Sequence, residues 1–514
     1  MEHEWLLWSL IALPALPALP VLGGLAAAAL PRPRWALAGM CVTIFGASAL
    51  SLYAAVQVFA QGAIFAANDW LFLDALSAYH LIVMALVFAL SSAYAWTYFN
   101  AELAAGHLTL TQTRIFVSLW CGAFSAMTLV LISNNLGIMW VGIEATTLFT
   151  AFLICVHQSR ESLEAMWKYI LMCSVGVAFA FIGTLLAVTS AHELHLPTHD
   201  VMLWTKLRES APLLDPVLIK AAFIFLIVGY GTKAGLAPMH NWLPDAHSQA
   251  PAPVSAIFSG FMLNAALYCI MRYIPIVESA TGCQGWGSNL LVGFGLLSTL
   301  VAAGFIIFQR DLKRLLAYSS VEHIGIIALG LGLGGLGTFA ALFHTLNHSI
   351  CKTLAFFAAG RLGQIYGTHD MTRMHGSLRR APVWGIGMFG AILALIGVAP
   401  FAIFMSELLI VKAAIDSRSF ITLVVFLLSS SIVFIGALGH AIPLAWGRSS
   451  ASENENNTRK NSARATTLET TLVAFALLSL LVLGVWISEP LRAVLWQASR
   501  VIQDSGATIA GATP

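Results

Sequence analysis

The stretch VLIKAAFIFLIVGYGTKAGLAP, residues 217–238, decides the fold, because it is apolar and long enough to cross a bilayer yet holds Lys233 near its end. An ionisable side chain inside a membrane costs at least about 2 kcal/mol, so it normally faces the interior of a helix bundle and serves a function there. Glu144 and Glu407 stand in comparable apolar surroundings elsewhere in the chain. Three such groups, in three different segments, predict a path for charge through the membrane.

Composition places the whole chain in the membrane. Of its 514 residues, 59% are hydrophobic and 10% are charged, and the mean hydropathy is +0.83. Apolar runs of about 20 residues, the length of a helix that crosses a bilayer, recur from one end to the other. We therefore predict an all-α polytopic membrane protein with about fourteen transmembrane helices. The predicted spans are 4–29, 35–58, 73–98, 115–133, 135–157, 163–189, 217–238, 251–273, 287–308, 312–333, 336–360, 383–414, 419–446 and 467–488.

The distribution of lysine and arginine predicts the orientation of the chain. Basic residues are frequent in the loops between odd- and even-numbered spans, as at Arg310 and Lys313, and rare in the opposite loops. Because basic loops stay in the cytoplasm, we expect both termini on the non-cytoplasmic side of a cell inner membrane. The polar segment 449–465 is predicted to be a flexible cytoplasmic loop.

The predicted spans divide the chain into five parts. These are N-terminal helices (1–114), a first repeat of five helices (115–273), a second repeat of five helices (274–447), a cytoplasmic loop (448–466) and a last transmembrane helix with a short tail (467–514).

Motifs for cofactors and nucleic acids are missing from the sequence. The seven cysteines are scattered singly, and no CxxC occurs that would indicate an iron–sulfur cluster or a zinc site. No Walker loop and no dinucleotide-binding glycine motif is present. Basic residues do not alternate with aromatic ones in a patch, so nucleic acid is not an expected partner. We expect no cofactor and no metal on this chain.

Two of the predicted spans contain helix-breaking residues. Gly235 and Pro238 lie near the end of the seventh span, and Gly397 and Pro400 lie in the middle of the twelfth. Broken helices are tolerated at membrane depth only where the backbone is buried in protein or lines a wet cavity. Since paired interruptions are typical of transporters built from inverted repeats, the spacing of five spans indicates two five-helix repeats.

Glu144 and Lys233 are the candidate translocating groups of the first repeat. If the fifth and seventh spans touch, Lys233 is a candidate counter-ion for Glu144. A buried lysine beside a movable carboxylate can take up and release a proton. The alternatives are a structural pair that fixes packing, or a lysine that extends to the membrane surface.

Lys168, Asp245 and His247 are predicted to line an opening on the cytoplasmic side. A second interpretation is that Lys168 is an interfacial anchor and that Asp245 and His247 cap and turn the chain.

The second repeat contains His344, His348 and Lys352 at a spacing of four, which places them on one face of a helix. Because histidine titrates near neutral pH, these residues can form links of a proton relay, together with His323 and, at its end, Glu407. Metal binding is an alternative, although the glutamate of a HExxH motif is absent. For His323, a histidine bonded to serine in the core is the other interpretation.

Four further segments are characteristic: WVGIEATT from Trp140, EAMWKY from Glu164, LAPMHNWLPDAHS from Leu236 and SVEH from Ser320. Together with the motifs above, they resemble the antiporter-like subunits of respiratory complex I, Mrp cation/proton antiporters and group 4 nickel–iron hydrogenases. Within that superfamily these four segments are most similar to component F of hydrogenase-4.

The resemblance implies fourteen helices in two inverted repeats, with broken helices 7 and 12. It also implies translocation roles for Glu144, Lys233, the histidines with Lys352, and Glu407. One feature departs from the pattern, because many relatives carry a lysine in the eighth helix and residues 259–268 contain no charge here. The link between the two half-channels would then depend on His323 or on water.

The leading hypothesis is a subunit that translocates protons or sodium in a multi-subunit redox complex. Other membrane subunits and a soluble redox module, hydrogenase-like or complex I-like, would be its partners and would hold the cofactors. One alternative is the proton-conducting subunit of a non-redox transporter, either an Mrp-type antiporter or an inorganic-carbon uptake complex. Another is a structural scaffold without conduction.

Overall fold

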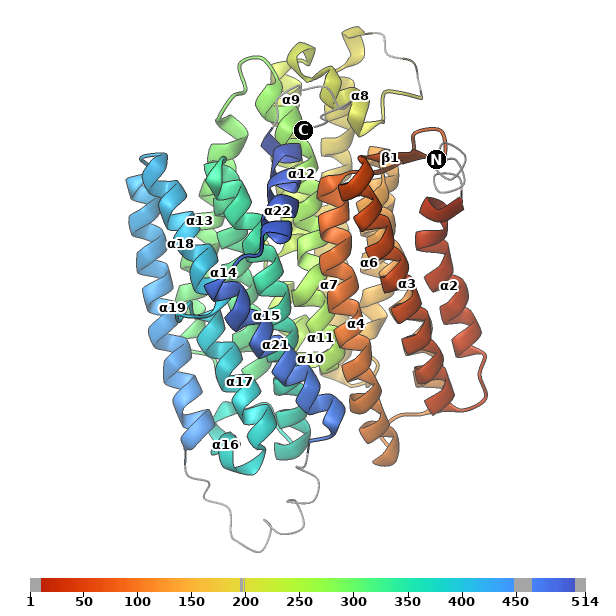
Figure 1. Ribbon diagram of the computed structural model, residues 1–514, viewed down its shortest axis with the longest axis vertical. Coiled ribbons are helices and arrows are strands. Elements are labelled where there is room, and N and C mark those ends of the chain that lie inside the picture. Colours follow the sequence, from red (N-terminus) through yellow and green to blue (C-terminus); the bar gives the residue numbers. More distant parts are fainter. Residues whose placement is uncertain (1–10, 195–196, 198, 448–464, 504–514) are drawn as a thin grey trace, which may run out of the picture.

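The computed structural model describes residues 11–194, 197, 199–447 and 465–503 as a bundle of long helices (Figure 1). In the view of Figure 1, α2 (Leu13–Ala28) and α3 (Pro33–Gln61) form one edge, and α13 (Trp286–Ile306), α18 (Ala402–Asp416) and α19 (Phe420–Trp446) form the other. The centre holds α4 (Ala75–Ala104), α12 (Leu263–Ser279) and α15 (Leu336–Tyr366). The predicted helical membrane protein is therefore confirmed.

The remaining elements complete the bundle and its connections. The other long helices are α5 (Leu110–Ile132), α6 (Leu136–Ile154), α7 (Arg160–Thr189), α9 (Pro216–Ala234), α14 (Leu312–Leu333), α17 (Pro382–Leu395), α21 (Thr467–Val485) and α22 (Glu489–Gln503). The shorter elements are β1 (Ile64–Ala66), β2 (Leu71–Leu73), η2 (His192–Leu194), α8 (Trp204–Glu209), η3 (Ala211–Leu213), α10 (Trp242–Gln249), α11 (Ala252–Ile257), η4 (Phe258–Met262), η5 (Met371–Arg373) and α16 (Ser377–Arg380). The two strands pair antiparallel between α3 and α4.

Side-chain caps fix the starts of several helices. The Asp74 side chain accepts a hydrogen bond from the backbone N–H of Ser77 at the start of α4, and Asp311 does the same for Arg314 at the start of α14. In α5, Thr109 and Gln112 form a reciprocal capping box. Such caps satisfy backbone donors that have no partner within the helix.

Eleven helices in the described part of the chain are long and apolar enough to cross a membrane. Three of the fourteen predicted spans do not meet this criterion of length and apolar character. The first predicted span is described only from residue 11 and corresponds to the 16-residue helix α2. The eleventh corresponds to α15, which carries His344, His348 and Lys352. The twelfth is broken into the two shorter helices α17 and α18. The chain is a multi-pass membrane protein with at least eleven candidate spans.

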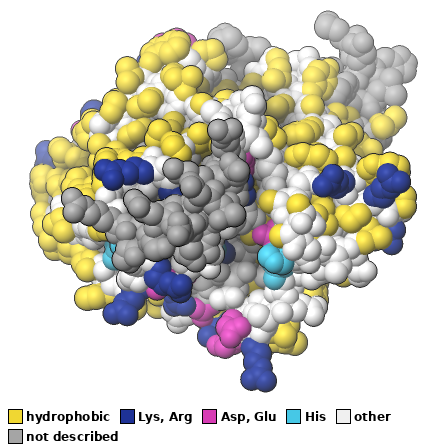
Figure 2. All heavy atoms as spheres, turned by 90° about the horizontal axis from the view of Figure 1, so that it is seen from below, with side chains coloured by type: hydrophobic (Ala, Val, Ile, Leu, Met, Phe, Trp, Pro, Cys, Tyr) yellow, Lys and Arg dark blue, Asp and Glu magenta, His cyan; other side chains and the backbone are white. Residues whose placement is uncertain are grey.

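The exposed surface of the outer helices suits lipid. On α19, the side chains of Ile421, Val424 and Ile435 are 64–82% exposed, and the helix carries no Lys, Arg, Asp or Glu. Figure 2 views the molecule from below and shows Lys and Arg side chains spread over its lower end. The predicted loop at 448–466 lies, except for its last two residues, outside the described residues.

Both predicted interruptions are present. Helix α9 ends at Ala234, where Gly235 adopts a left-handed conformation (φ 82°), and the chain turns before α10. Helix α17 ends at Leu395, and Gly397 adopts a similar conformation (φ 68°) before α18. Positive φ favours glycine because other residues meet steric strain there.

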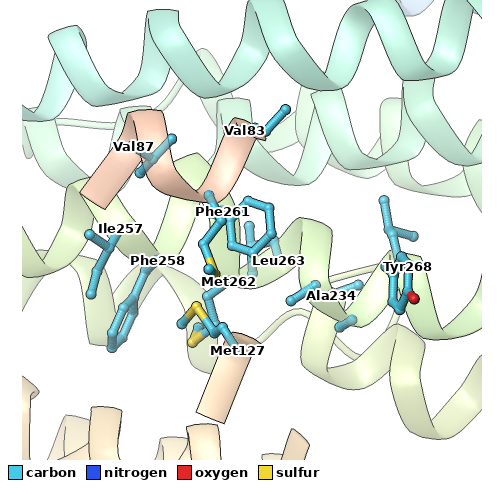
Figure 3. Packing of buried hydrophobic residues seen from close by; sticks show 14 of the residues in the cluster. Val83, Val87, Met127, Ala234, Ile257, Phe258, Phe261, Met262, Leu263 and Tyr268 are labelled. Atoms are coloured by element: carbon cyan, nitrogen blue, oxygen red, sulfur yellow. The ribbon is translucent and has the colours of Figure 1, made fainter. Parts of the chain in front are cut away.

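The eighth span crosses the centre of the bundle and is buried throughout. It consists of α11, the π-helical turn η4 and α12, and every residue of its most apolar window is buried. Figure 3 shows Phe258, Phe261 and Met262 of η4 packed among Val83, Val87 and Met127 of neighbouring helices. A π-helical turn inside a helix is often found at a functional site.

The C-terminal region differs from the predicted single helix with a short tail. The chain breaks after α21 and continues as α22, which packs on α4, α12 and α15. Gly484 permits this arrangement, because a Cβ atom there would stand 1.9 Å from the carbonyl oxygen of Pro400. The end of α21 therefore rests against the break in the twelfth span.

We expect Gly484→Ala to destabilise the protein by about 1–3 kcal/mol, since the clash involves rigid backbone. The thermal unfolding midpoint of the purified protein in detergent measures this. Gly439→Ala is the matched control, because a Cβ atom at Gly439 in α19 meets nothing within 4 Å. Equal midpoints for the two variants would contradict the close approach.

Candidate functional site

Lys233 lies fully buried in the last turn of α9 and is held by hydroxyl groups. Its Nζ donates to Thr147 Oγ1 on α6 at 2.9 Å and to the Tyr169 hydroxyl on α7. Its Nζ also lies 4.6 Å from the centroid of the Tyr169 ring. The lysine thus sits between α6 and α7, where neutral acceptors surround a charge that burial disfavours.

Glu144 does not form the expected ion pair with Lys233. It is half-buried on α6, where Oε1 accepts a hydrogen bond of 2.8 Å from Ser174 Oγ and Oε2 is buried with no hydrogen-bond partner in the part of the chain that the structure describes. The lysine instead bonds to Thr147, three residues further along the same helix. The expectation of a direct pair is wrong because hydroxyl groups occupy the position of the counter-ion.

A chain of hydroxyl groups extends from Lys233 towards the eighth span. The Tyr169 hydroxyl lies 2.6 Å from Thr150 Oγ1, and both approach the thioether of Met262, at 3.5 and 3.7 Å. Next to Met262, η4 presents the apolar rings of Phe258 and Phe261 (Figure 3). The polar chain of the first repeat therefore ends at an apolar layer.

On its other side, the eighth span offers polar groups to the second repeat. Ser259 Oγ lies 2.7 Å from Ser320 Oγ on α14, and Asn264 Nδ2 lies 3.2 Å from Ser349 Oγ on α15. The Leu316 carbonyl accepts from both Ser320 Oγ, at 3.0 Å, and Lys352 Nζ, at 2.8 Å. An uncharged serine thus connects the eighth span to the lysine of the second repeat.

Three histidines form a buried cluster between α14, α15 and α18. His323 Nδ1 lies 3.0 Å from His344 Nε2, and His344 Nδ1 lies 2.9 Å from Ser406 Oγ. The ring of His348 lies 5.1 Å from that of His323, and neither of its nitrogens has a hydrogen-bond partner among the described residues. Which nitrogen carries each proton depends on the tautomer, so either direction of transfer is compatible with these contacts.

Two carboxylates flank this cluster. Glu407 lies one residue after Ser406, and its Oε2 would stand 2.3 Å from a Cβ atom placed on Gly397, so the carboxylate rests against the break in the twelfth span. Glu322 is 4% exposed, and within residues 11–194, 197, 199–447 and 465–503 its Oε2 has no hydrogen-bond partner. The sequence reveals Glu322 as a neighbour of His323, but we did not predict it as a site residue.

Three residues were predicted to line an opening on the cytoplasmic side, and two of them, Lys168 and Asp245, line a pocket in the structure. Lys168 Nζ bonds to Glu164 at 2.7 Å and to Asp245 at 3.1 Å, beside a pocket of about 110 Å³. His247 lies deeper and is fully buried, with its ring 4.7 Å from that of Phe356. Neither of its nitrogens bonds to another described residue. It is therefore an interior group rather than a lining residue.

Two basic residues at the start of α14, Lys313 and Arg314, also belong to this region. Arg314 donates to Asp245 at 2.7 Å. Lys313 is 4% exposed and donates to the carbonyls of Ser248 and Ala250 at 2.9 and 2.6 Å. They do so because the break after α9 brings α10 against the start of α14.

A second charged cluster, not predicted, lies at the opposite end of the bundle. Arg272 on α12 binds Asp74 through two hydrogen bonds of 2.6 and 2.7 Å, and both side chains are at least 92% buried. Arg272 also donates to Tyr268, whose ring lies 5.1 Å from that of His80. The sequence contains an indication of this pair, because Asp74 lies at the start of the predicted span 73–98 and Arg272 at the end of the predicted span 251–273.

Comparison with known proteins places this arrangement in a family. Residues 133–433 match the model described as NADH:quinone oxidoreductase/Mrp antiporter, transmembrane. The chain belongs to this family. The matched region contains every predicted site residue, from Glu144 to Glu407, whereas Asp74 and α22 lie outside it.

Relatives within the family are similar over most of the chain. A hydrogenase-4 component F homolog from Methylacidiphilum infernorum is 40% identical over 68% of this chain and 73% of its own. Hydrogenase-4 component B from Escherichia coli is 30% identical over 65% of this chain and 49% of its own. These values agree with the predicted resemblance to hydrogenase-4.

Two solved structures share the family fold. A chain of the membrane-bound sulfane sulfur reductase, an archaeal respiratory membrane complex, superposes with a TM-score of 0.84 at 23% identity over 97% of this chain and 98% of its own. A chain of the Mrp complex from a Dietzia species gives a TM-score of 0.81 at 19% identity over 96% and 97%. The antiporter-like fold is thus shown over nearly the whole length.

Proposed function

We propose that this chain translocates protons across the inner membrane as a subunit of a multi-subunit redox-driven complex, of the hydrogenase-4 or complex I type. The observation that carries the proposal is the buried row of ionisable groups inside the bundle, with Lys233 in one half and the histidine cluster and Lys352 in the other. Groups of this kind in a membrane interior are typical of proton relays.

Protons are the proposed ion rather than sodium. Sodium prefers a cage of oxygen ligands, whereas His323, His344 and His348 offer ring nitrogens that donate and accept protons. The contact of 3.0 Å between His323 and His344 is short enough for direct transfer.

The path that we propose begins at Lys168 and Asp245, where the pocket opens between α7 and α10. It passes His247 and Lys233 in the first half, and continues through Lys352 and the histidines to Glu407. Between the halves, the apolar layer at Met262 separates Tyr169 from Ser259, so water would have to enter there for a proton to pass.

Fourteen spans in two inverted five-helix repeats form the proposed architecture. The two interrupted helices support it, since each carries a glycine with positive φ three residues before a proline, five predicted spans apart. The pairs α17–α18 and α9–α10 would be equivalent in the two repeats, with α15 next to the former and α7 next to the latter.

Redox partners are proposed because the relatives include two hydrogenase-4 components. A soluble redox module and other membrane subunits would supply the free energy for translocation. The alternative is a non-redox transporter, since a component of a probable K(+)/H(+) antiporter from Rhizobium meliloti is 30% identical over 63% of this chain and 33% of its own. Copurification of a hydrogenase-like or complex I-like protein would favour the redox-driven complex.

Replacing His344 with glutamine tests the relay. Glutamine keeps hydrogen bonding but does not titrate near neutral pH, so we expect proton uptake by membrane vesicles to fall at least about tenfold. The midpoint of thermal unfolding should change little, because the contact with Ser406 can persist.

His440→Gln is the control, because His440 on α19 bonds only to the Ile307 carbonyl among the described residues. It should transport at the wild-type rate. If His344 binds metal, its variant should instead release a stoichiometric metal, and a chelator should inhibit the wild-type protein. Unchanged uptake in His344→Gln would refute the relay.

A further inference from the structure

We propose that a groove between α2 and α5 binds an anionic phospholipid, with the headgroup phosphate at Arg114 and an acyl chain along the apolar wall. The groove lies before residues 133–433, the region that matches the family, and it is separate from the residues of the translocation path. The lipid site therefore goes beyond the proposed function and does not depend on it.

The wall of the groove is apolar and faces outward from the bundle. Leu25, Ala28 and Ala29 line it from the end of α2, and Ile115 and Leu119 line it from α5. The two alanines leave space because their side chains end at Cβ. The groove holds about 520 Å³, which is in the range of sites for small molecules. Leu25 and Ile115 are 58% and 52% exposed, so this wall is open to an apolar ligand.

Arg114 carries the single charge among the residues that line the groove. It stands near the start of α5, and its Nη2 donates to the Leu30 carbonyl at 3.2 Å. Its Nε is buried and has no acceptor among the residues that the structure describes. A buried donor without an acceptor is costly, and a guanidinium can bind phosphate oxygens through several donors at once. A phosphate at this end of the groove would complete the hydrogen bonds of Arg114.

The surroundings of Arg114 are also positively charged. Arg32 and Arg34 follow Leu30 in the connection from α2 to α3, and both are exposed. Helices α2, α3 and α5 contain no Asp or Glu that could neutralise them. The Arg32 guanidinium lies 4.8 Å from the centroid of the Trp35 ring, and Trp35 is 50% exposed. Because three arginines gather without a carboxylate on these helices, the complementary ligand is an anion.

The position of the arginines at helix ends favours a lipid headgroup. Helix α2 ends at Ala28 and α3 begins at Pro33, and Figure 1 shows the two joined at their lower ends. Irregular backbone that faces lipid does not occur within the hydrocarbon, so such a connection lies at the level of the headgroups or beyond. Exposed tryptophan and basic residues next to an apolar helix are typical of that level.

The combination of a basic rim and an apolar wall distinguishes a phospholipid from other anions. Free phosphate would satisfy Arg114 but leave Leu25 and Ile115 uncovered. A zwitterionic lipid would bring its own cation close to the arginines. An anionic phospholipid supplies both the phosphate and the acyl chain, without a cation.

Photo-crosslinking in native membranes identifies the occupant. A benzoylphenylalanine residue replaces Ile115 in the groove or, as a control, the exposed Ile435 on α19. We expect phospholipid adducts at both positions, with anionic headgroups enriched at least about fivefold at Ile115, since one arginine near a headgroup contributes roughly that factor. Adducts to protein only at Ile115, or the same lipid composition at both positions, would overturn the proposal.

Thermal unfolding of the purified protein in detergent provides the second measurement. Phosphatidylglycerol should raise the midpoint by at least about 2 °C, because a ligand that binds only the folded state stabilises it. Phosphatidylcholine and inorganic phosphate should not raise it. An equal effect of phosphatidylcholine would refute the selectivity for anionic lipid, and an equal effect of inorganic phosphate would show an anion site without a lipid.

Two variants locate this stabilisation in the groove. Arg114→Gln keeps a donor for the Leu30 carbonyl but loses the charge, and Ala29→Trp fills the groove without changing the charge. Both should abolish the shift caused by phosphatidylglycerol. Arg379→Gln is the control, because Arg379 is exposed on α16 and does not line the groove. A shift in Arg114→Gln equal to that of Arg379→Gln would refute the site and leave the proposed translocation intact.

Discussion

Lys233→Met should reduce proton translocation to less than about a tenth of the wild-type rate while the protein still assembles. Methionine has nearly the length of lysine but cannot carry a proton or a charge. The hydroxyls that lose the lysine keep other partners, since Tyr169 bonds to Thr150 and Thr147 bonds to the Ile143 carbonyl. Proton uptake by membrane vesicles, normalised to the amount of assembled protein, measures the effect.

Two further variants make this result specific to Lys233. Lys220→Met changes a half-buried lysine near the start of the same helix and should leave transport unchanged. Lys233→Arg keeps the charge but should transport poorly, because arginine does not release its proton in proteins. Wild-type uptake in Lys233→Met would rule out a translocating role for this residue.

Arg272→Met should destabilise the protein by about 3–5 kcal/mol, because it leaves the buried carboxylate of Asp74 without its counter-ion. Arg272 donates to both oxygens of Asp74, to Ser77 and to Tyr268, and it also stacks on Trp204 at 4.5 Å. Its loss would separate the start of α4 from α12 at the end of the bundle opposite the pocket. The thermal unfolding midpoint in detergent and the yield of folded protein measure the change.

The double variant Asp74→Asn with Arg272→Met should recover part of the lost stability, since it removes both charges. Arg418→Met is the control on the surface, where Arg418 is exposed in the turn before α19, and its effect should stay within about 0.5 kcal/mol. An Arg272→Met protein as stable as Arg418→Met would show that the pair contributes little to the fold.

The sequence alone determined the class of the molecule and the segments that enter the membrane. Apolar runs of sufficient length require helices in a bilayer, because no other open structure satisfies the backbone there. Gly235 and Gly397 marked the two interruptions, since each glycine adopts a positive φ that disfavours other residues. The spacing of His344, His348 and Lys352 placed them on one face, because helical periodicity is a local property.

The tertiary structure decided which of these groups meet. Lys233 bonds to Thr147 and Tyr169, 86 and 64 residues away, and Arg272 pairs with Asp74 across 198 residues. Helical periodicity places a residue on a face of its own helix, but it does not determine which other helix packs against that face. Hydroxyl groups therefore replaced the expected counter-ion of Lys233, and the start of α14 became part of the pocket.

The course of α22 was also decided by packing alone. Its sequence is amphipathic and weakly hydrophobic, which is typical of a helix at a membrane surface as well as of one that covers a bundle. The absence of a side chain at Gly484 lets α21 end against Pro400, and the buried face of α22 then docks on α4, α12 and α15. Such a close approach depends on the shapes of helices distant in sequence, which the pattern of apolar and polar residues does not record.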